Sequence, residues 1–173
     1  MRLADLNALP DSAARAELLR CCGSSRWALM MASARPFATA DMMAVHADAV
    51  WSSLDATDWL EAFRAHPRIG ESVVATGAAG PGESDGAGRW SEQEQALVQS
   101  ADDAVRHRLA EANRRYEARF GYIFIVCATG TRADEILVML ERRLTNDPDL
   151  ERRIAAEEQR RITRLRIAKL IAA

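Results

Sequence analysis

One stretch of the sequence, FGYIFIVCA at residues 120–128, has the aromatic and β-branched composition of a buried strand. A buried strand has to pair with another strand, because its backbone N–H and C=O groups need partners once they leave water. No second stretch of this kind is present in the sequence to pair with it. We therefore expect residues 120–128 to form an extended, buried connection between helices, and no sheet.

The remainder of the chain has helical composition and spacing, with abundant Ala, Leu, Arg and Glu and only five prolines. In the helix expected to begin after an N-cap at Thr39, Met42, Val45, Ala49 and Val50 are expected to share one apolar face. The predicted helices cover, approximately, residues 12–22 before Gly23, 24–35 before Pro36, 40–54, 57–65, 91–119, 132–144 after an N-cap at Thr131, and 148–170 with Pro148 in the first turn.

These patterns predict an all-α fold. At 173 residues, the chain is expected to form a single domain over residues 1–173. A Gly-rich loop is expected at residues 72–90, where no hydrophobic pattern is found.

Charge and cysteine content narrow the class of protein. The formal net charge is -2, which favours neither nucleic acid nor a membrane surface as a partner, and no apolar run is long enough for a transmembrane helix. The three cysteines include an adjacent pair, Cys21 and Cys22, and do not form a disulfide framework. Together with an N-terminal stretch that lacks a signal-peptide pattern, this predicts a cytoplasmic protein.

The stretch FRAHPRIGE at residues 63–71 is the first candidate for chemistry. Because proline disfavours the α conformation in the residue before it, the helix should end near Ala65 and leave His66 just beyond its end. Such a histidine could carry a proton for a reaction. It could equally cap carbonyl groups or face water.

A second candidate is Glu94 in the stretch SEQEQ at residues 91–95. Ser91 and Glu94 match the capping box of a helix N-terminus, which is a structural role. A carboxylate at a helix start that follows a flexible loop could also meet a ligand carrying N–H or O–H groups. The two roles are compatible.

Arg166 is the third candidate, because Ile162 and Leu170 flank it at helical spacing and Leu165 is its neighbour. It could point inward, where it would need an anionic partner, although most arginines of such a helix are solvated. His46 is expected to be half-buried and His107 solvated. No zinc motif, hydrolase nucleophile motif or phosphate-binding loop is found in the sequence, so we expect no metal and no organic cofactor.

Taken together, several stretches resemble the OHCU decarboxylase family, where OHCU is 2-oxo-4-hydroxy-4-carboxy-5-ureidoimidazoline. The resemblance covers nearly the whole chain outside the Gly-rich loop, and its most specific parts are HPRIG and FGYIFIVCATG. The other matching stretches are LNALP, CCGSSRWALMM, RPF, SEQEQ, NRRYEARFGYIFIVCATG and ILVMLERRLTNDPDLE with the later LRIAKL.

The resemblance implies an all-α, homodimeric, cofactor-free enzyme that decarboxylates OHCU to (S)-allantoin, the last step from urate to allantoin. His66, Glu94 and Arg166 match catalytic positions of the family. The matching substrate-binding positions are Pro67, Ser91, Glu92, Gln93, Glu94, Gln95, Phe124, Ile125, Val126, Cys127, Ala128 and Arg166. The loop at 72–90 is longer and richer in glycine than the family's commonest pattern, so the resemblance does not imply that it acts as a lid.

Two other functions remain open from the residues themselves. One is a different ureide-processing enzyme, such as a hydrolase, which would normally need a metal cage or a triad. The other is a non-catalytic helical domain that binds a partner or serves as a scaffold. Acceleration of OHCU loss without added metal would separate the decarboxylase from both.

Overall fold

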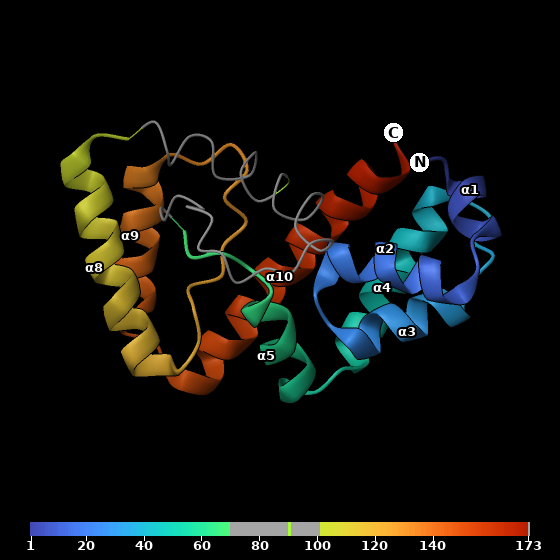
Figure 1. Cartoon of the computed structure of the whole chain (residues 1–173). Coiled ribbons are helices and arrows are strands. Elements are labelled where there is room, and N and C mark those ends of the chain that lie inside the picture. The colour runs from blue at the N-terminus through green and yellow to red at the C-terminus, as the bar shows by residue number, and fades with distance from the viewer. Residues whose placement is uncertain (70–89, 91–100, 173) are drawn as a thin grey trace. The chain divides into compact units, whose positions relative to one another are not determined.

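The computed structural model describes residues 1–69, 90 and 101–172, and all regular secondary structure in these residues is helical (Figure 1). The predicted all-α fold is therefore confirmed. The chain divides into two compact units. The first unit is built from residues 1–65 together with the chain from Gln159 onward, and the second unit spans residues 66–158. That the whole chain is a single domain stays a prediction.

The first unit packs its helices around large side chains. Trp27 is fully buried, and its indole N–H donates to the carbonyl of Ala47 at 3.1 Å, which joins two of these helices. The other large, fully buried side chains of this unit include Leu6, Leu18, Met31, Met43, Phe63 and Ile167. Its helices are α1 (Leu3–Ala8), α2 (Asp11–Cys22), α3 (Ser25–Ser33), α4 (Ala40–Ser53), α5 (Ala56–Arg64) and the second half of α10 (Pro148–Ile171).

Helix ends in this unit follow from local hydrogen bonds. Thr39 is the N-cap of α4, as predicted, and its hydroxyl accepts from the N–H of Met42. The predicted start of α5 at Thr57 is slightly late, because the Asp55 carboxylate accepts from the N–H groups of Thr57 and Asp58 and so begins the helix at Ala56. Helix α1 was not predicted, because six residues carry too little periodicity to stand out.

The predicted apolar face of α4 is partly wrong. Met42 and Val45 are 59% and 65% exposed, whereas Met43 and Val50 lie in the core with Ala47 and Trp51. Apolar residues occur on more than one side of this helix, so its periodicity alone does not select the side that packs against α3.

Gly23 ends α2 in the left-handed conformation, with φ of +83°. A Cβ atom at this position would lie 2.5 Å from the Cβ of Ala65 and 3.2 Å from the carbonyl oxygen of Ala62. The end of α2 can therefore approach the end of α5 only because residue 23 has no side chain.

We expect Gly23→Ala to lower the free energy of unfolding by about 3 kcal/mol, combining left-handed strain with overpacking. Gly121→Ala is the matched control, because Gly121 has φ of +78° and nothing within 4 Å of the added Cβ. It should cost only about 1 kcal/mol. Urea unfolding of both variants measures the difference, and equal losses would show that the contact with Ala65 does not matter.

The second unit contains α8 (Asp103–Phe120), α9 (Ala133–Arg143) and the first half of α10. Helices α8 and α9 pack side by side, and an extended connection links them (Figure 1). The core of this unit comprises Ile69, Leu109, Ala112, Tyr116, Phe124, Val126, Ala128, Ala133, Ile136, Leu137 and Leu140.

Two predicted boundaries in this unit are wrong. The helix expected over 91–119 does not run through Asp102, because this residue is extended and its carboxylate caps α8 by accepting from the N–H of Val105. The N-cap of α9 is Arg132 instead of Thr131, since the Glu135 carboxylate accepts from the N–H of Arg132. Apart from Trp90, which is helical, the loop predicted at 72–90 lies outside the described residues, and so do residues 91–100, where the sequence placed the start of the helix.

Among the described helices, none is long and apolar enough to cross a membrane. The stretch 123–128 forms neither helix nor strand, and Phe124, Ile125, Val126 and Ala128 are buried. The extended connection predicted over 120–128 is therefore confirmed for residues 123–128, whereas Phe120 is the last residue of α8 and residues 121–122 form a bend.

Candidate active site

His66 follows directly on the end of α5. The helix ends at Arg64, Ala65 is its C-cap, and His66 is a half-buried residue in a bend before Pro67. The predicted helix end before the His-Pro pair is confirmed. Proline disfavours the helical conformation in the residue before it, so the chain leaves the helical path at His66.

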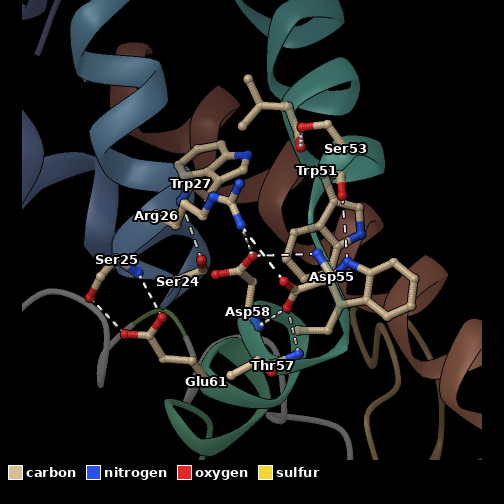
Figure 2. A network of polar contacts seen from close by, with 12 residues as sticks. Ser24, Ser25, Arg26, Trp27, Trp51, Ser53, Asp55, Thr57, Asp58 and Glu61 are labelled. Atoms are coloured by element: carbon tan, nitrogen blue, oxygen red, sulfur yellow. Dashed lines mark hydrogen bonds and ion pairs between the residues drawn. The ribbon is translucent and has the colours of Figure 1, made fainter.

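A polar network ties α5 to the start of α3 (Figure 2). The Glu61 carboxylate accepts from the hydroxyl of Ser25 at 2.6 Å and from its N–H at 3.1 Å. Arg26 donates to Asp58 at 3.2 Å and lies 3.7 Å from Asp55. Helix α5 is therefore fixed at both its first and its second turn.

The residues after His66 are fixed against α8. Arg68 forms a two-pronged ion pair with Glu117, with distances of 2.6 and 3.0 Å. The side-chain amide of Asn113 donates to the carbonyl of Ile69 at 2.9 Å. Ile69 in turn packs in one apolar cluster with Phe124. The segment that carries His66 and Pro67 and the extended connection thus share one core.

Two side chains hold the backbone of the extended connection. Nη1 of Arg143 donates to the carbonyl of Ile125 at 2.9 Å, and Oε2 of Glu158 accepts from the N–H of Cys127 at 2.8 Å. The Arg143 guanidinium also lies over the Phe124 ring, 4.5 Å from its centroid. Cys127 is half-buried.

The carboxylate of Glu151 fixes the position of the Arg143 side chain. Glu151 is fully buried and accepts from Nε of Arg143 at 2.8 Å, from the side-chain amide of Asn146 at 2.8 Å, and from the hydroxyl of Tyr116. Burial and this hydrogen bond raise the pKa of Tyr116, so its hydroxyl remains a donor. The donors offset the cost of burying the charge of Glu151.

Arg166 lies in the part of α10 that belongs to the first unit and is only 3% exposed. Ile162 and Leu170 are buried beside it on the helix, as the spacing predicted, whereas Leu165 is exposed. The positive charge of Arg166 acts to lower the pKa of Cys21 and Cys22, but burial dominates and raises both pKa values to about 12.

Because the pKa values of Cys21 and Cys22 are raised, we expect the protein to lose stability at alkaline pH. Unfolded thiols ionise near pH 9, whereas the folded ones remain protonated to about pH 12. The unfolded state then binds fewer protons, so the free energy of unfolding is fully retained below pH 9 and falls as the pH rises above it. We expect a loss of about 2 kcal/mol per thiol by about pH 10.5.

Urea unfolding at several pH values measures this loss. Cys21→Ala and Cys22→Ala should each flatten the alkaline slope, and Cys127→Ala, which removes the half-buried thiol, serves as the comparison. If stability falls with alkaline pH as steeply in Cys21→Ala and Cys22→Ala as in the wild type, the loss does not come from these two thiols.

The similarity of this chain to known proteins extends over nearly its whole length. A family model described as OHCU decarboxylase matches residues 7–168. A uric acid degradation bifunctional protein from Arabidopsis thaliana is 41% identical over 151 residues, which cover 87% of this chain and 45% of the plant protein. A crystal structure of OHCU decarboxylase in the presence of (S)-allantoin superposes with a TM-score of 0.77 at 35% identity, covering 91% of this chain and 99% of that one.

The chain belongs to the OHCU decarboxylase family. A further family relative, the 2-oxo-4-hydroxy-4-carboxy-5-ureidoimidazoline decarboxylase of Amia calva, is 33% identical over 139 residues, or 80% of this chain and 76% of that protein. The chain spans less than half of the plant bifunctional protein, so the comparison with that relative concerns only one part of it.

The site residues expected from the family resemblance fall into three groups. His66, Pro67 and residues 124–128 lie in the second unit, and Arg166 lies in the first. The predicted substrate-binding residues of the SEQEQ stretch are outside the described residues: Ser91, Glu92, Gln93, Glu94 and Gln95. His46 is half-buried against the Phe37 ring, and His107 is exposed, both as predicted.

No group of three or more His, Cys, Asp or Glu side chains that could hold a metal occurs within the described part of this family member. Three side chains that contact or support the extended connection were not predicted from the sequence: Arg143, Glu151 and Glu158. The hydrogen-bond partners of these three side chains lie 5–35 residues away in sequence, and nothing in local spacing indicates such contacts.

Proposed function

We propose that the chain catalyses the decarboxylation of OHCU to (S)-allantoin, the last step in the oxidation of urate to allantoin. The observation that carries this function is the family match over residues 7–168, which includes His66, the extended connection and Arg166. The enzyme is a carbon–carbon lyase of the carboxy-lyase class.

The reaction breaks the bond between the ring carbon and its carboxylate, and CO2 leaves. The electron pair stays on the ring carbon and is delocalised into the adjacent C=N bond, so the substrate supplies its own electron sink. The hydroxyl group on that carbon then loses its proton and becomes a carbonyl, and a proton must reach the neighbouring, ureido-bearing carbon on one face, which becomes the stereocentre of (S)-allantoin. The protein has to orient the substrate, supply the proton and exclude water from the reacting carbon.

The proposed role of His66 is to move this proton, either by activating the hydroxyl group or by protonating the carbanion. Imidazole suits the task because its ordinary pKa of about 6.5 lies near neutral pH. The position of His66 beyond the end of α5, held by Pro67, supports this role.

The other proposed roles concern substrate binding. Glu94 would accept a hydrogen bond from the hydroxyl or a ring N–H, with Ser91, Glu92, Gln93 and Gln95 beside it in sequence. Peptide groups of residues 124–128 would contact the ring and ureido edges. Arg166 would pair with substrate oxygens, and its burial supports a specific role for its charge.

We also propose that the enzyme works as a cytoplasmic homodimer without a metal or organic cofactor. The family resemblance supports the dimer. The cysteine content supports the compartment.

The test is to add the purified chain to freshly generated OHCU and follow the loss of its optical signal. We expect rapid conversion to a single enantiomer of allantoin, at a rate that survives exhaustive chelation. No acceleration over the spontaneous reaction would favour a non-catalytic helical domain. Loss of activity on chelation would favour a metal-dependent ureide-processing enzyme instead.

A further inference from the structure

We propose that Arg143 and Glu158 are positioning residues that set the backbone of the extended connection for the substrate. This inference rests on the proposed function, in which peptide groups of residues 124–128 contact the substrate. Arg143 holds the carbonyl of Ile125, and Glu158 holds the N–H of Cys127.

A connection with neither helix nor strand geometry has no regular ladder of backbone hydrogen bonds to fix it. Two anchors on peptide groups two residues apart fix both its position along the chain direction and its rotation about that direction. The anchors come from different helices, α9 and α10, so both helices have to be in place for the connection to adopt this conformation.

The contacts of Arg143 make it a better anchor than a lysine. Nε and Nη2 lie 2.8 and 2.6 Å from Oε1 of Glu151, while Nη1 reaches the carbonyl of Ile125. The same planar group covers the Phe124 ring. One ammonium group cannot meet the carboxylate, the carbonyl and the ring at once.

The anchors also limit which peptide groups can contact a substrate. The carbonyl of Ile125 and the N–H of Cys127 are engaged by side chains, and the carbonyl of Ala128 accepts from the N–H of Thr131 at 2.9 Å. The N–H of Cys127 is therefore taken by Glu158, whereas each of the two carbonyls keeps a second lone pair. A substrate that accepts a hydrogen bond has to use another N–H of the connection, such as that of Val126, which lies between the two anchors.

The experiment compares Glu158→Met with Glu158→Gln. Methionine cannot accept the hydrogen bond from Cys127, whereas the side-chain oxygen of glutamine can. We expect Glu158→Met to lower kcat/KM about 10- to 100-fold, because a small misplacement of binding groups has effects of this size. Glu158→Gln should restore most of the activity. Glu111→Met, at an exposed position of α8, is the control for introducing methionine.

Arg143→Lys supplies a second, independent variant, with Arg142→Lys as its control at the exposed neighbouring position. We expect a loss of similar size for Arg143→Lys and no loss for Arg142→Lys. Amide hydrogen exchange adds a readout that does not depend on turnover, since the N–H of Cys127 should exchange at least about tenfold faster in Glu158→Met.

Failure of this inference is distinguishable from failure of the proposed function. If the wild type turns over OHCU and Glu158→Met has normal kcat and KM, only the positioning roles are overturned. Equal losses of activity in Glu158→Met and Glu158→Gln would have the same consequence. Absence of turnover by the wild type would overturn the proposed function. If Arg143→Lys does not fold, the Glu158 pair still decides the question.

Discussion

Replacing His66 with asparagine is expected to lower the rate of OHCU decarboxylation by about 10²-fold or more, the loss typical of a general acid or base. The fold should survive, because residue 66 lies beyond the end of α5 and is only half-buried. The product provides a second readout. The wild type should give one enantiomer of allantoin, and His66→Asn should drift toward the racemate that forms in water.

Two other histidines serve as controls for this substitution. His107 is exposed on α8, so His107→Asn should leave the rate and the melting temperature unchanged. His46→Asn should leave the rate unchanged but lower the melting temperature slightly, because it removes the contact with the Phe37 ring. Near-normal rate and full stereoselectivity in His66→Asn would remove this histidine from the mechanism.

Replacing Arg166 with methionine is expected to weaken transition-state stabilisation by about 3 kcal/mol, as for loss of a charge-stabilising contact, which is a fall of more than 10²-fold in kcat/KM. Methionine roughly retains the length of the side chain but removes its charge and its donors. Stability should fall as well, because removing one member of a buried polar contact leaves the other member uncompensated. Steady-state kinetics with a thermal melt checks both expectations.

Arg164→Met is the matched control for Arg166. Arg164 lies two residues away on the same helix, is exposed, and pairs with Asp48, a contact that should be worth at most about 1 kcal/mol of stability. Its kcat/KM should stay at the wild-type value. Equal kinetic losses in the two variants would indicate a general effect of charge in α10 and not a role specific to Arg166.

The helical architecture could be predicted from the sequence because its main signals are local. The His-Pro pair ends α5, Gly23 ends α2, and Thr39 begins α4, each through backbone preferences of one or two residues. The predictions that were wrong depend on choices between neighbours. The apolar periodicity continues across Asp102, but the carboxylate of Asp102 caps the start of α8 there.

The site could be predicted only as far as sequence resemblance and helix spacing extend. The apolar neighbours of Arg166 at four-residue spacing allowed the inward position that the structure shows, but they left a solvated side chain open as the alternative. The pairing of Tyr116, Arg143 and Glu151 could not be predicted, because these side chains meet only after α8, α9 and α10 have packed. A glutamate in the first turn of a helix is normally explained by its favourable interaction with the helix dipole. The sequence around Glu151 gives no sign that this side chain is buried.

The course of α10 has a consequence for synthesis on the ribosome. Residues up to Glu158 suffice to complete the second unit, whereas the first unit needs both the first 65 residues and the chain from Gln159 onward. Until the end of α10 has been translated, the apolar residues of α2–α4 therefore lack three side chains that complete their core, Ile162, Ile167 and Leu170. We expect the second unit to fold first although it comes later in the sequence, and nascent chains that stop before residue 159 to be prone to aggregate through the unfinished first unit.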